Sequence, residues 1–260
     1  MVTEQTRLLI ADIGGYTRFM TVHRINLAHA HYMISRLMEA LIDSLGRGWR
    51  LAKLEGDAAF VYKRVSAKAA DEAIHIDDQV RAMIASFRRR QRDLRDQRIC
   101  NCDGCVQVGD LTIKFVAHEG EVAFRKIKRN VELAGVDVIL VHRLLKNSVP
   151  IVEYLLMSER VHAQLEAGVR DGATALDEKL EGLGQVTTYY VDVADLGAAT
   201  PAPAARSPIP ALWQWLAMTV RSIPLFIGVR KPRIGAANRL AIEGRAPSLK
   251  PSAPGGGDEL

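Results

Sequence analysis

The sequence feature that most constrains the fold is an apolar run near the N-terminus that contains a single carboxylate. Residues 7–13 read RLLIADI, and the glycines Gly14 and Gly15 follow directly. A nearly continuous apolar run is typical of a strand buried on both faces of a sheet. Asp12 lies inside the run, and a buried charge without a partner is energetically costly. We therefore expect a central strand whose carboxylate faces a specific partner.

A second aspartate, Asp57, follows Gly56 in KLEGDAAFVY, at the expected turn between two apolar strands. If these strands lie beside the first one, Asp12 and Asp57 converge at one edge of the sheet. Two close carboxylates repel each other unless a cation lies between them, and hard oxygen ligands favour Mg²⁺, which usually serves nucleotide phosphates. The backbone N–H groups of Gly14 and Gly15 would then approach the phosphates. A turn aspartate and a capping aspartate are the alternative explanation.

The pattern of the remaining chain predicts an α+β domain with a mainly antiparallel sheet backed by helices. We expect helices at about residues 26–45, 66–98, 135–148 and 159–166. We expect strands at about 7–13, 49–64 (a hairpin turning at Gly56), 111–128 (a pair turning at Gly120), 154–158 and 185–193.

The chain of 260 residues is 48% hydrophobic and 25% charged, which is ordinary for a soluble globular protein. No basic segment followed by an apolar core begins the chain, so we expect no secretory signal and a cytoplasmic location. Residues 201–260 contain eight Lys/Arg and three Asp/Glu, a difference that equals the net charge of +5 of the whole chain. Because the preceding residues are then neutral overall, the basic pI does not indicate a nucleic-acid partner.

Four short motifs resemble, in the same order, the signatures of the catalytic domain of class III adenylyl and guanylyl cyclases. The motifs are ADIGGYTRF, KLEGDAAFVY, KFVAHEGEV and VELAGVDVILVHRLL, which begin at residues 11, 53, 114 and 131. The resemblance covers about residues 5–195 and is nearest to a bacterial branch with a Cys-x-Cys-x-x-Cys insertion. It implies a ferredoxin-like cyclase-homology domain that binds a nucleoside triphosphate. It also implies a homodimer, because the active site of such enzymes forms between two chains.

The resemblance implies roles for individual residues of this sequence. Asp12 and Asp57 match the two aspartates that hold two Mg²⁺ or Mn²⁺ ions in the family. Lys53 matches the base-reading lysine of adenylyl cyclases, and Glu132 stands where those enzymes have an aspartate that helps to read adenine. Arg143 matches the arginine that stabilises charge in the transition state, although a surface salt bridge is its alternative role. Together these residues favour ATP as substrate, with cyclic AMP and pyrophosphate as products.

One position departs from the family pattern. The family has an asparagine four residues before the arginine, and this chain has Ile139, whose side chain forms no hydrogen bond. Losing one preorganised polar contact can reduce a rate by about 10²–10³. Two interpretations follow, namely a slow or unusual cyclase and a cyclase-like module that binds a nucleotide or a partner without turnover. His118 also matches a family position, and we interpret it as a structural turn histidine rather than a catalytic one.

All three cysteines, Cys100, Cys102 and Cys105, lie within six residues among turn-forming residues. In a reducing cytosol such a cluster suggests metal or redox chemistry more than disulfides. A tight turn with three thiolates suits Zn²⁺, but a structural zinc site needs a fourth ligand, for which His118 and His75 are candidates. An iron–sulfur cluster, a ligand from a second chain, a regulatory thiol pair and plain reduced thiols are the alternatives.

The C-terminal region is expected to be distinct from the domain. We expect a Pro/Ala linker at 196–208, an apolar amphipathic segment at 209–229 and a basic, largely disordered tail at 230–260. A helix over residues 211–223 would be roughly 20 Å long, shorter than the ~30 Å core of a bilayer. Its tryptophans and the nearby basic residues suit the anionic inner surface of a membrane. The alternative is packing on the domain or on a second chain.

Overall fold

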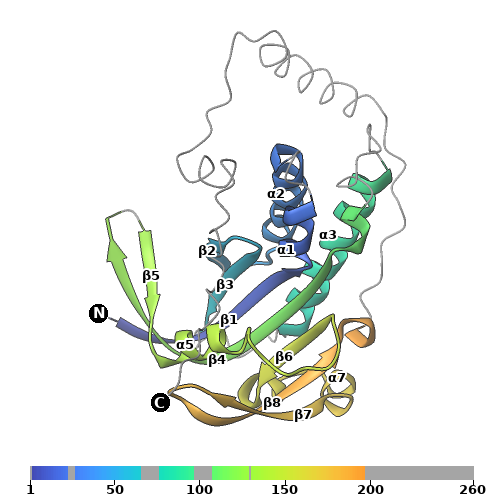
Figure 1. Cartoon of the computed structure of the whole chain (residues 1–260). Helices are drawn as coiled ribbons and strands as arrows, with labels where there is room; N and C mark the ends of the chain where they lie inside the picture. Colours follow the sequence, from blue (N-terminus) through green and yellow to red (C-terminus); the bar gives the residue numbers. More distant parts are fainter. Residues whose placement is uncertain (1, 23–26, 66–75, 97–106, 129, 197–260) are drawn as a thin grey trace, which may run out of the picture. The chain divides into compact units, whose positions relative to one another are not determined.

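The computed structural model describes residues 2–22, 27–65, 76–96, 107–128 and 130–196, all within the unit Met1–Ala205 (Figure 1). The cysteine cluster, His75, the linker after Leu196 and both C-terminal segments lie outside the described residues. The predictions made for those segments therefore stay predictions.

An eight-stranded sheet forms the centre of the described domain, with strand order β2-β3-β1-β4-β6-β8-β7 and with β5 paired to β4. Every strand pair is antiparallel except β4 with β6, which is parallel. The strands are β1 (Val2–Gly14), β2 (Trp49–Glu55), β3 (Ala58–Arg64), β4 (Thr112–Ile127), β5 (Asn130–Ala134), β6 (Tyr154–Ser158), β7 (Thr174–Leu180) and β8 (Gly184–Asp192).

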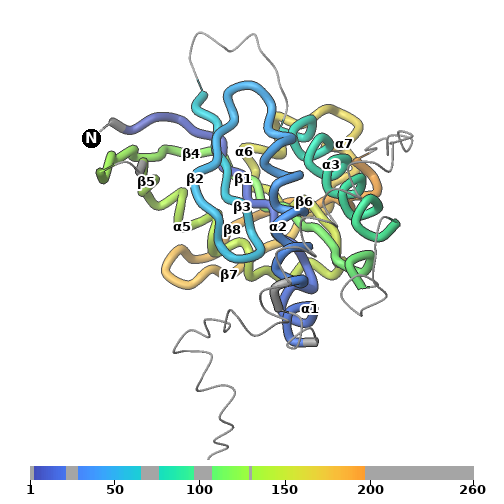
Figure 2. The backbone as a smooth tube through the Cα atoms, turned by 90° about the horizontal axis from the view of Figure 1, so that it is seen from above, coloured from blue at the N-terminus to red at the C-terminus, as the bar shows by residue number. Residues whose placement is uncertain are grey.

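Helices cover both faces of this sheet. The helices are α1 (Tyr16–Val22), α2 (Leu27–Asp43), α3 (Ile76–Asp96), α5 (Val136–Arg143), α6 (Glu159–His162) and α7 (Ala167–Asp171), with short 3₁₀ turns at Val108–Asp110 and Val193–Leu196. Figures 1 and 2 show α2 and α3 side by side. They pack on one face of the sheet through Leu37, Met83 and Phe87, while Val141 of α5 packs on the other face.

Strand β1 is central because its side chains serve both faces. Leu9 and Ile13 belong to the cluster shared with α2 and α3, whereas Leu8 and Ile10 belong to the cluster shared with α5. Successive side chains of a strand point to opposite faces, so a strand between two apolar layers needs an apolar residue at nearly every position. Within the run of residues 8–13 Asp12 is the exception, and it lies two residues before the end of β1.

The structure confirms the expected fold class, and it confirms the central strand and the hairpin at Gly56, where φ is 69°. The expected turn at Gly120 is wrong. Strand β4 runs unbroken through Gly120, and the chain turns only after Ile127, where Lys128 has a φ of 56°. Strand β7 has no counterpart in the sequence prediction, because its consecutive charged residues 177–179 interrupt the apolar alternation.

Candidate functional site

The two aspartates singled out by the sequence lie close together. The β1–β3 register places Asp12 opposite Ala58, the first residue of β3, and the N–H of Ile13 donates to the carbonyl oxygen of Asp57 at 3.0 Å. Burial, and then the charge of Asp12, raise the pKa of Asp57, while its own backbone hydrogen bond and the charge of Lys114 act in the opposite direction. The ionised pair is therefore electrostatically unfavourable until more positive charge reaches it.

The donor set fits a hard divalent cation. Asp12 and Asp57 offer carboxylate oxygens, and Mg²⁺ is commonly held by one or two carboxylates together with waters and substrate phosphates. Within the described ranges, no group of three or more His, Cys, Asp or Glu is placed to hold a metal by itself. The pair thus suits an ion whose remaining ligands come from a phosphate-bearing substrate.

Gly14, the last residue of β1, and Gly15, which follows it, have structural reasons to be glycine. A Cβ built on Gly14 would lie 2.2 Å from Oγ1 of Thr112, the residue paired with it on β4. Gly15 has a φ of 84°, and its carbonyl oxygen accepts a hydrogen bond from the N–H of Phe19 at 2.9 Å. Packing and backbone conformation are enough to explain why both residues are glycine. Their expected contact with phosphates therefore stays a prediction.

Lys53 and Glu132 are not joined by an ion pair. Lys53 lies on β2 with a side chain that is 66% exposed, and its Nζ is 3.3 Å from Glu55 Oε1. Glu55 Oε2 is also 3.5 Å from His142 Nδ1, so this carboxylate links β2 to α5. Glu132 lies on β5 opposite Arg125, in the hairpin that projects from the sheet in Figure 1.

Arg143 is the last residue of α5, and it forms an ion pair at the surface. Its Nη1 donates to Glu181 Oε2 at 2.8 Å, and this contact lowers the pKa of Glu181. Both residues line an open pocket of about 550 Å³ between α5 and the end of β7. Ile139, which is 51% exposed, lines the same pocket with Lys146 and Lys179. Across the described domain, no hydrogen bond or ion pair connects Arg143 with Asp12 or Asp57.

His118 is a buried residue with both ring nitrogens satisfied, as the structural interpretation predicts, although it lies in a strand rather than in a turn. Its Nδ1 is 2.8 Å from Ser158 Oγ, and its Nε2 is 2.9 Å from Asp137 Oδ1. The N–H of Glu121 donates to the other oxygen of Asp137 at 2.6 Å. This contact is possible because Gly120 has no side chain. His118 and Asp137 thereby fasten the start of α5 to β4 and β6.

We expect Gly120→Ala to lower the free energy of unfolding by about 3 kcal/mol, because overpacking and lost buried hydrogen bonds would add. The new Cβ would lie 2.2 Å from Asp137 Cγ and 2.7 Å from its Cβ, so the whole side chain would have to move. Chemical denaturation measures the change. Gly168→Ala is the matched control, since its Cβ meets nothing within 4 Å. Equal stability of the two variants would contradict the packing role of Gly120.

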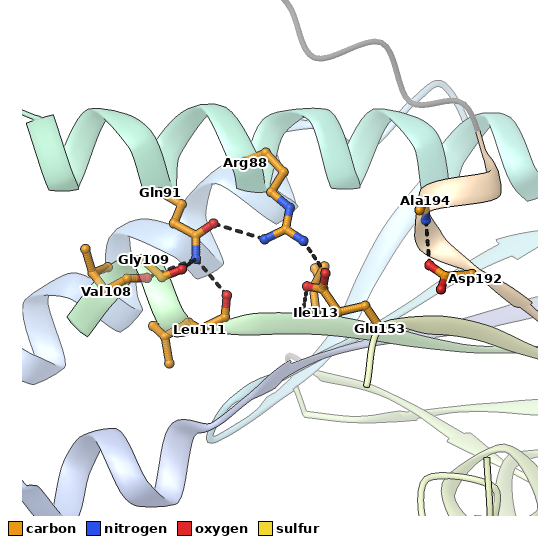
Figure 3. Close-up of polar contacts among 9 residues, drawn as sticks. All are labelled: Arg88, Gln91, Val108, Gly109, Leu111, Ile113, Glu153, Asp192 and Ala194. Atoms are coloured by element: carbon orange, nitrogen blue, oxygen red, sulfur yellow. Dashed lines mark hydrogen bonds and ion pairs between the residues drawn. The ribbon is translucent and has the colours of Figure 1, made fainter. Parts of the chain in front are cut away.

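A polar network fixes the beginning of β4 (Figure 3). Gln91 of α3 donates through Nε2 to the carbonyl oxygens of Val108 at 2.9 Å and Leu111 at 2.7 Å. Arg88 binds Gln91 and also Glu153, and Glu153 Oε1 accepts the N–H of Ile113 at 2.9 Å. The backbone that leads into β4 is therefore tied to α3 and to the residue that precedes β6.

Sequence reasoning missed three charged residues that contact the expected site residues. Lys114 lies 3.1 Å from Asp12, Glu181 binds Arg143, and Glu55 binds Lys53. Glu55 carries a local signal, because residues two apart on a strand share a face. The other two pairs depend on how β1 pairs with β4 and on where the β7–β8 turn lies in the folded domain, which the local sequence does not determine.

The domain has the fold of nucleotidyl cyclase catalytic domains. The catalytic core of a rhodopsin-guanylyl cyclase with converted specificity, solved in complex with ATPαS, superposes with a TM-score of 0.52 at 15% identity, over 73% of this chain and 97% of that one. An adenylate cyclase from Trypanosoma brucei, solved in its monomeric state, superposes with a TM-score of 0.51 at 17% identity, over 78% of this chain and 92% of that one.

The sequence comparison identifies the family. The chain is 43% identical over 204 residues to the "Uncharacterized protein Rv2561/Rv2562" of Mycobacterium tuberculosis (strain ATCC 25618 / H37Rv), covering 78% of this chain and 92% of the relative. This chain belongs to the same family as that mycobacterial protein. A family described as "Protein of unknown function (DUF2652)" matches residues 34–154.

Proposed function

We propose that this protein is a nucleotidyl cyclase that converts ATP to cyclic AMP and pyrophosphate. The observation that carries the proposal is the convergence of Asp12 and Asp57 in a domain with the cyclase fold. Such a carboxylate pair, at the end of a central strand and in the turn beside it, suits a nucleotide triphosphate bound with Mg²⁺ or Mn²⁺.

Each residue has a defined task in this proposal. Asp12 and Asp57 hold the divalent cations, which when bound supply activation of the ribose 3′-hydroxyl and neutralisation of the triphosphate. The guanidinium of Arg143 leaves its ion pair with Glu181 and binds phosphate oxygens of the substrate. It then stabilises the negative charge that develops on these oxygens in the transition state. Lys53 and Glu132 bind the base, which requires Lys53 to leave Glu55.

We further propose that two copies of the chain form the complete site. Arg143 and the carboxylate pair do not contact each other within one chain. Large apolar side chains are exposed on the elements around them, namely Leu54 on β2 and Val131 on β5. Exposed apolar groups of this kind are typical of protein–protein contacts.

One observation favours a second function, a module that binds a nucleotide without turnover. Ile139 lies in the pocket of Arg143, where the resemblance implies an asparagine that orients the ribose. A chain that keeps the carboxylate pair but lacks this contact can still bind a metal–nucleotide complex and signal its presence to a partner.

The test is a product assay on the purified full-length protein. Cyclic AMP and pyrophosphate should form from ATP in Mg²⁺ or Mn²⁺, more than cyclic GMP forms from GTP, and excess EDTA should stop the reaction. Sedimentation of the same preparation reports whether the chain is dimeric. If no product forms but ATP binds, the binding module is the correct function. If ATP does not bind at all, both functions are wrong.

Two predictions concern residues outside the described part of the chain. We propose that Cys100, Cys102 and Cys105 bind Zn²⁺, which requires zinc in the elemental analysis of the purified protein. We also propose that the protein is cytoplasmic and that its segment 209–229 binds the inner surface of the membrane. The full-length protein should then sediment together with anionic vesicles. None of the described helices is both long enough and apolar enough to cross a membrane.

A further inference from the structure

We propose that the ammonium group of Lys114 occupies the carboxylate site when no nucleotide is bound. It keeps free divalent cations out of the site and is displaced by the metal–nucleotide complex. The inference rests on the metal site of the proposed function, but it does not require turnover. It assigns a task to Lys114, the first residue of the motif KFVAHEGEV, for which the sequence analysis predicts no role.

The first observation is the position of the ammonium group. Lys114 on β4 pairs in register with Asp12 on β1, so both side chains leave the sheet on the same face. Nζ of Lys114 lies 3.1 Å from Oδ2 of Asp12, and the two side chains are only 25% and 17% exposed. The charge of Lys114 also acts on Asp57. The ammonium therefore pairs with Asp12 and offsets only part of the charge of Asp57, from a place that a metal ion bound to Asp12 would need.

The second observation is that hydrogen bonds and packing fix the backbone on both sides of Lys114. Residues just before it are tied to α3 through Gln91 and to Glu153 (Figure 3), and Thr112 packs against Gly14. Because these contacts fix β4 on both sides, we expect the strand to keep its position when an ion binds. The lysine side chain, in contrast, has a flexible four-carbon stem, so its ammonium can leave Asp12 without disturbing the sheet.

The consequence follows from the charges. A free divalent cation must displace the ammonium or share Asp12 with it, and two cations a few ångströms apart repel each other. A metal–nucleotide complex brings its own phosphate oxygens, and these accept the displaced ammonium. The site should therefore discriminate against the bare ion and in favour of the complex.

The experiment is a titration of the full-length protein with Mn²⁺, followed by electron paramagnetic resonance of the free ion. Lys114→Met should bind Mn²⁺ alone roughly tenfold more tightly than the wild type, because methionine keeps much of the stem and removes the charge. In the presence of a non-hydrolysable ATP analogue, the same variant should gain nothing or bind more weakly. Lys126→Met, on the exposed part of the same strand, should behave as the wild type.

Two further variants make each outcome decisive. Adding Asp57→Ala to Lys114→Met should abolish the gained affinity, which separates this site from acidic groups elsewhere on the surface. Lys114→Gln should reproduce the gain if Lys114→Met folds poorly. Equal Mn²⁺ affinity of the wild type and both Lys114 variants overturns the inference, even where binding depends on Asp57. Absence of Mn²⁺ binding in every variant overturns the inference together with the metal site, whereas lack of turnover alone removes only the proposed enzyme.

Discussion

Cyclic AMP formation is expected to fall by about 10³-fold or more in Asp57→Ala. Loss of a metal-holding carboxylate removes several kcal/mol of charge stabilisation from the transition state, and each 1.36 kcal/mol changes the rate tenfold. The loss should not result from unfolding. Burial and the charge of Asp12 raise the pKa of Asp57, so its ionised form is unfavourable in the folded protein without metal. The variant should therefore melt at the wild-type temperature or above it when EDTA is present.

The measurement is the initial rate of cyclic AMP formation at saturating ATP and Mn²⁺. Asp171→Ala is the control. This exposed carboxylate lies on α7, and in the described part of the chain its ion pair is with the neighbouring Arg170, at 3.4 Å. Undiminished activity of Asp57→Ala would show that the carboxylate pair does not hold the reactive metal. A lower melting temperature would show instead that Asp57 is needed for folding.

Ile139→Asn is expected to raise the rate of cyclic AMP formation by a factor on the order of 10². Ile139 lies one helical turn before Arg143 and lines the same pocket, so an amide at this position would present a donor and an acceptor beside the guanidinium. The cost in stability should be small, because a side chain that is 51% exposed loses little burial when it is replaced.

Val136→Asn is the matched control for this gain. Val136 lies on the same helix, is 63% exposed, and does not line the pocket. The two variants should therefore have similar stability, while only Ile139→Asn gains activity. A gain in kcat with little change in KM would place the new contact in the transition state. If neither variant gains activity, the pocket of Arg143 does not bind the ribose, and the non-catalytic binding module becomes the better explanation.

The sequence was sufficient where a local pattern decides the structure. The apolar run around Asp12 predicts a central strand, and the glycine at position 56 predicts the turn that brings Asp57 beside it. Both patterns follow from the period of a strand and from the conformational freedom of glycine. The same reasoning fails at Gly120, because a glycine that makes room for Asp137 looks the same in the sequence as one that makes a turn.

The contacts that the sequence could not predict join segments that are distant from each other along the chain. Lys114 faces Asp12 because β4 pairs with β1 in one particular register, and a shift by one residue would turn its side chain to the other face. Glu181 reaches Arg143 only because the β7–β8 turn lies near the end of α5. Register and turn placement are set by the packing of the whole domain, so motif spacing alone cannot predict such partners.

The attachment of Gln91 to the backbone of Val108 and Leu111 also has an evolutionary consequence. These hydrogen bonds join helix α3 directly to residues 108–111, which precede β4, independently of the covalent connection between them. Because these contacts themselves set the position of β4, we expect related chains that differ in the connecting segment to keep β4, and the site beside it, in the same place.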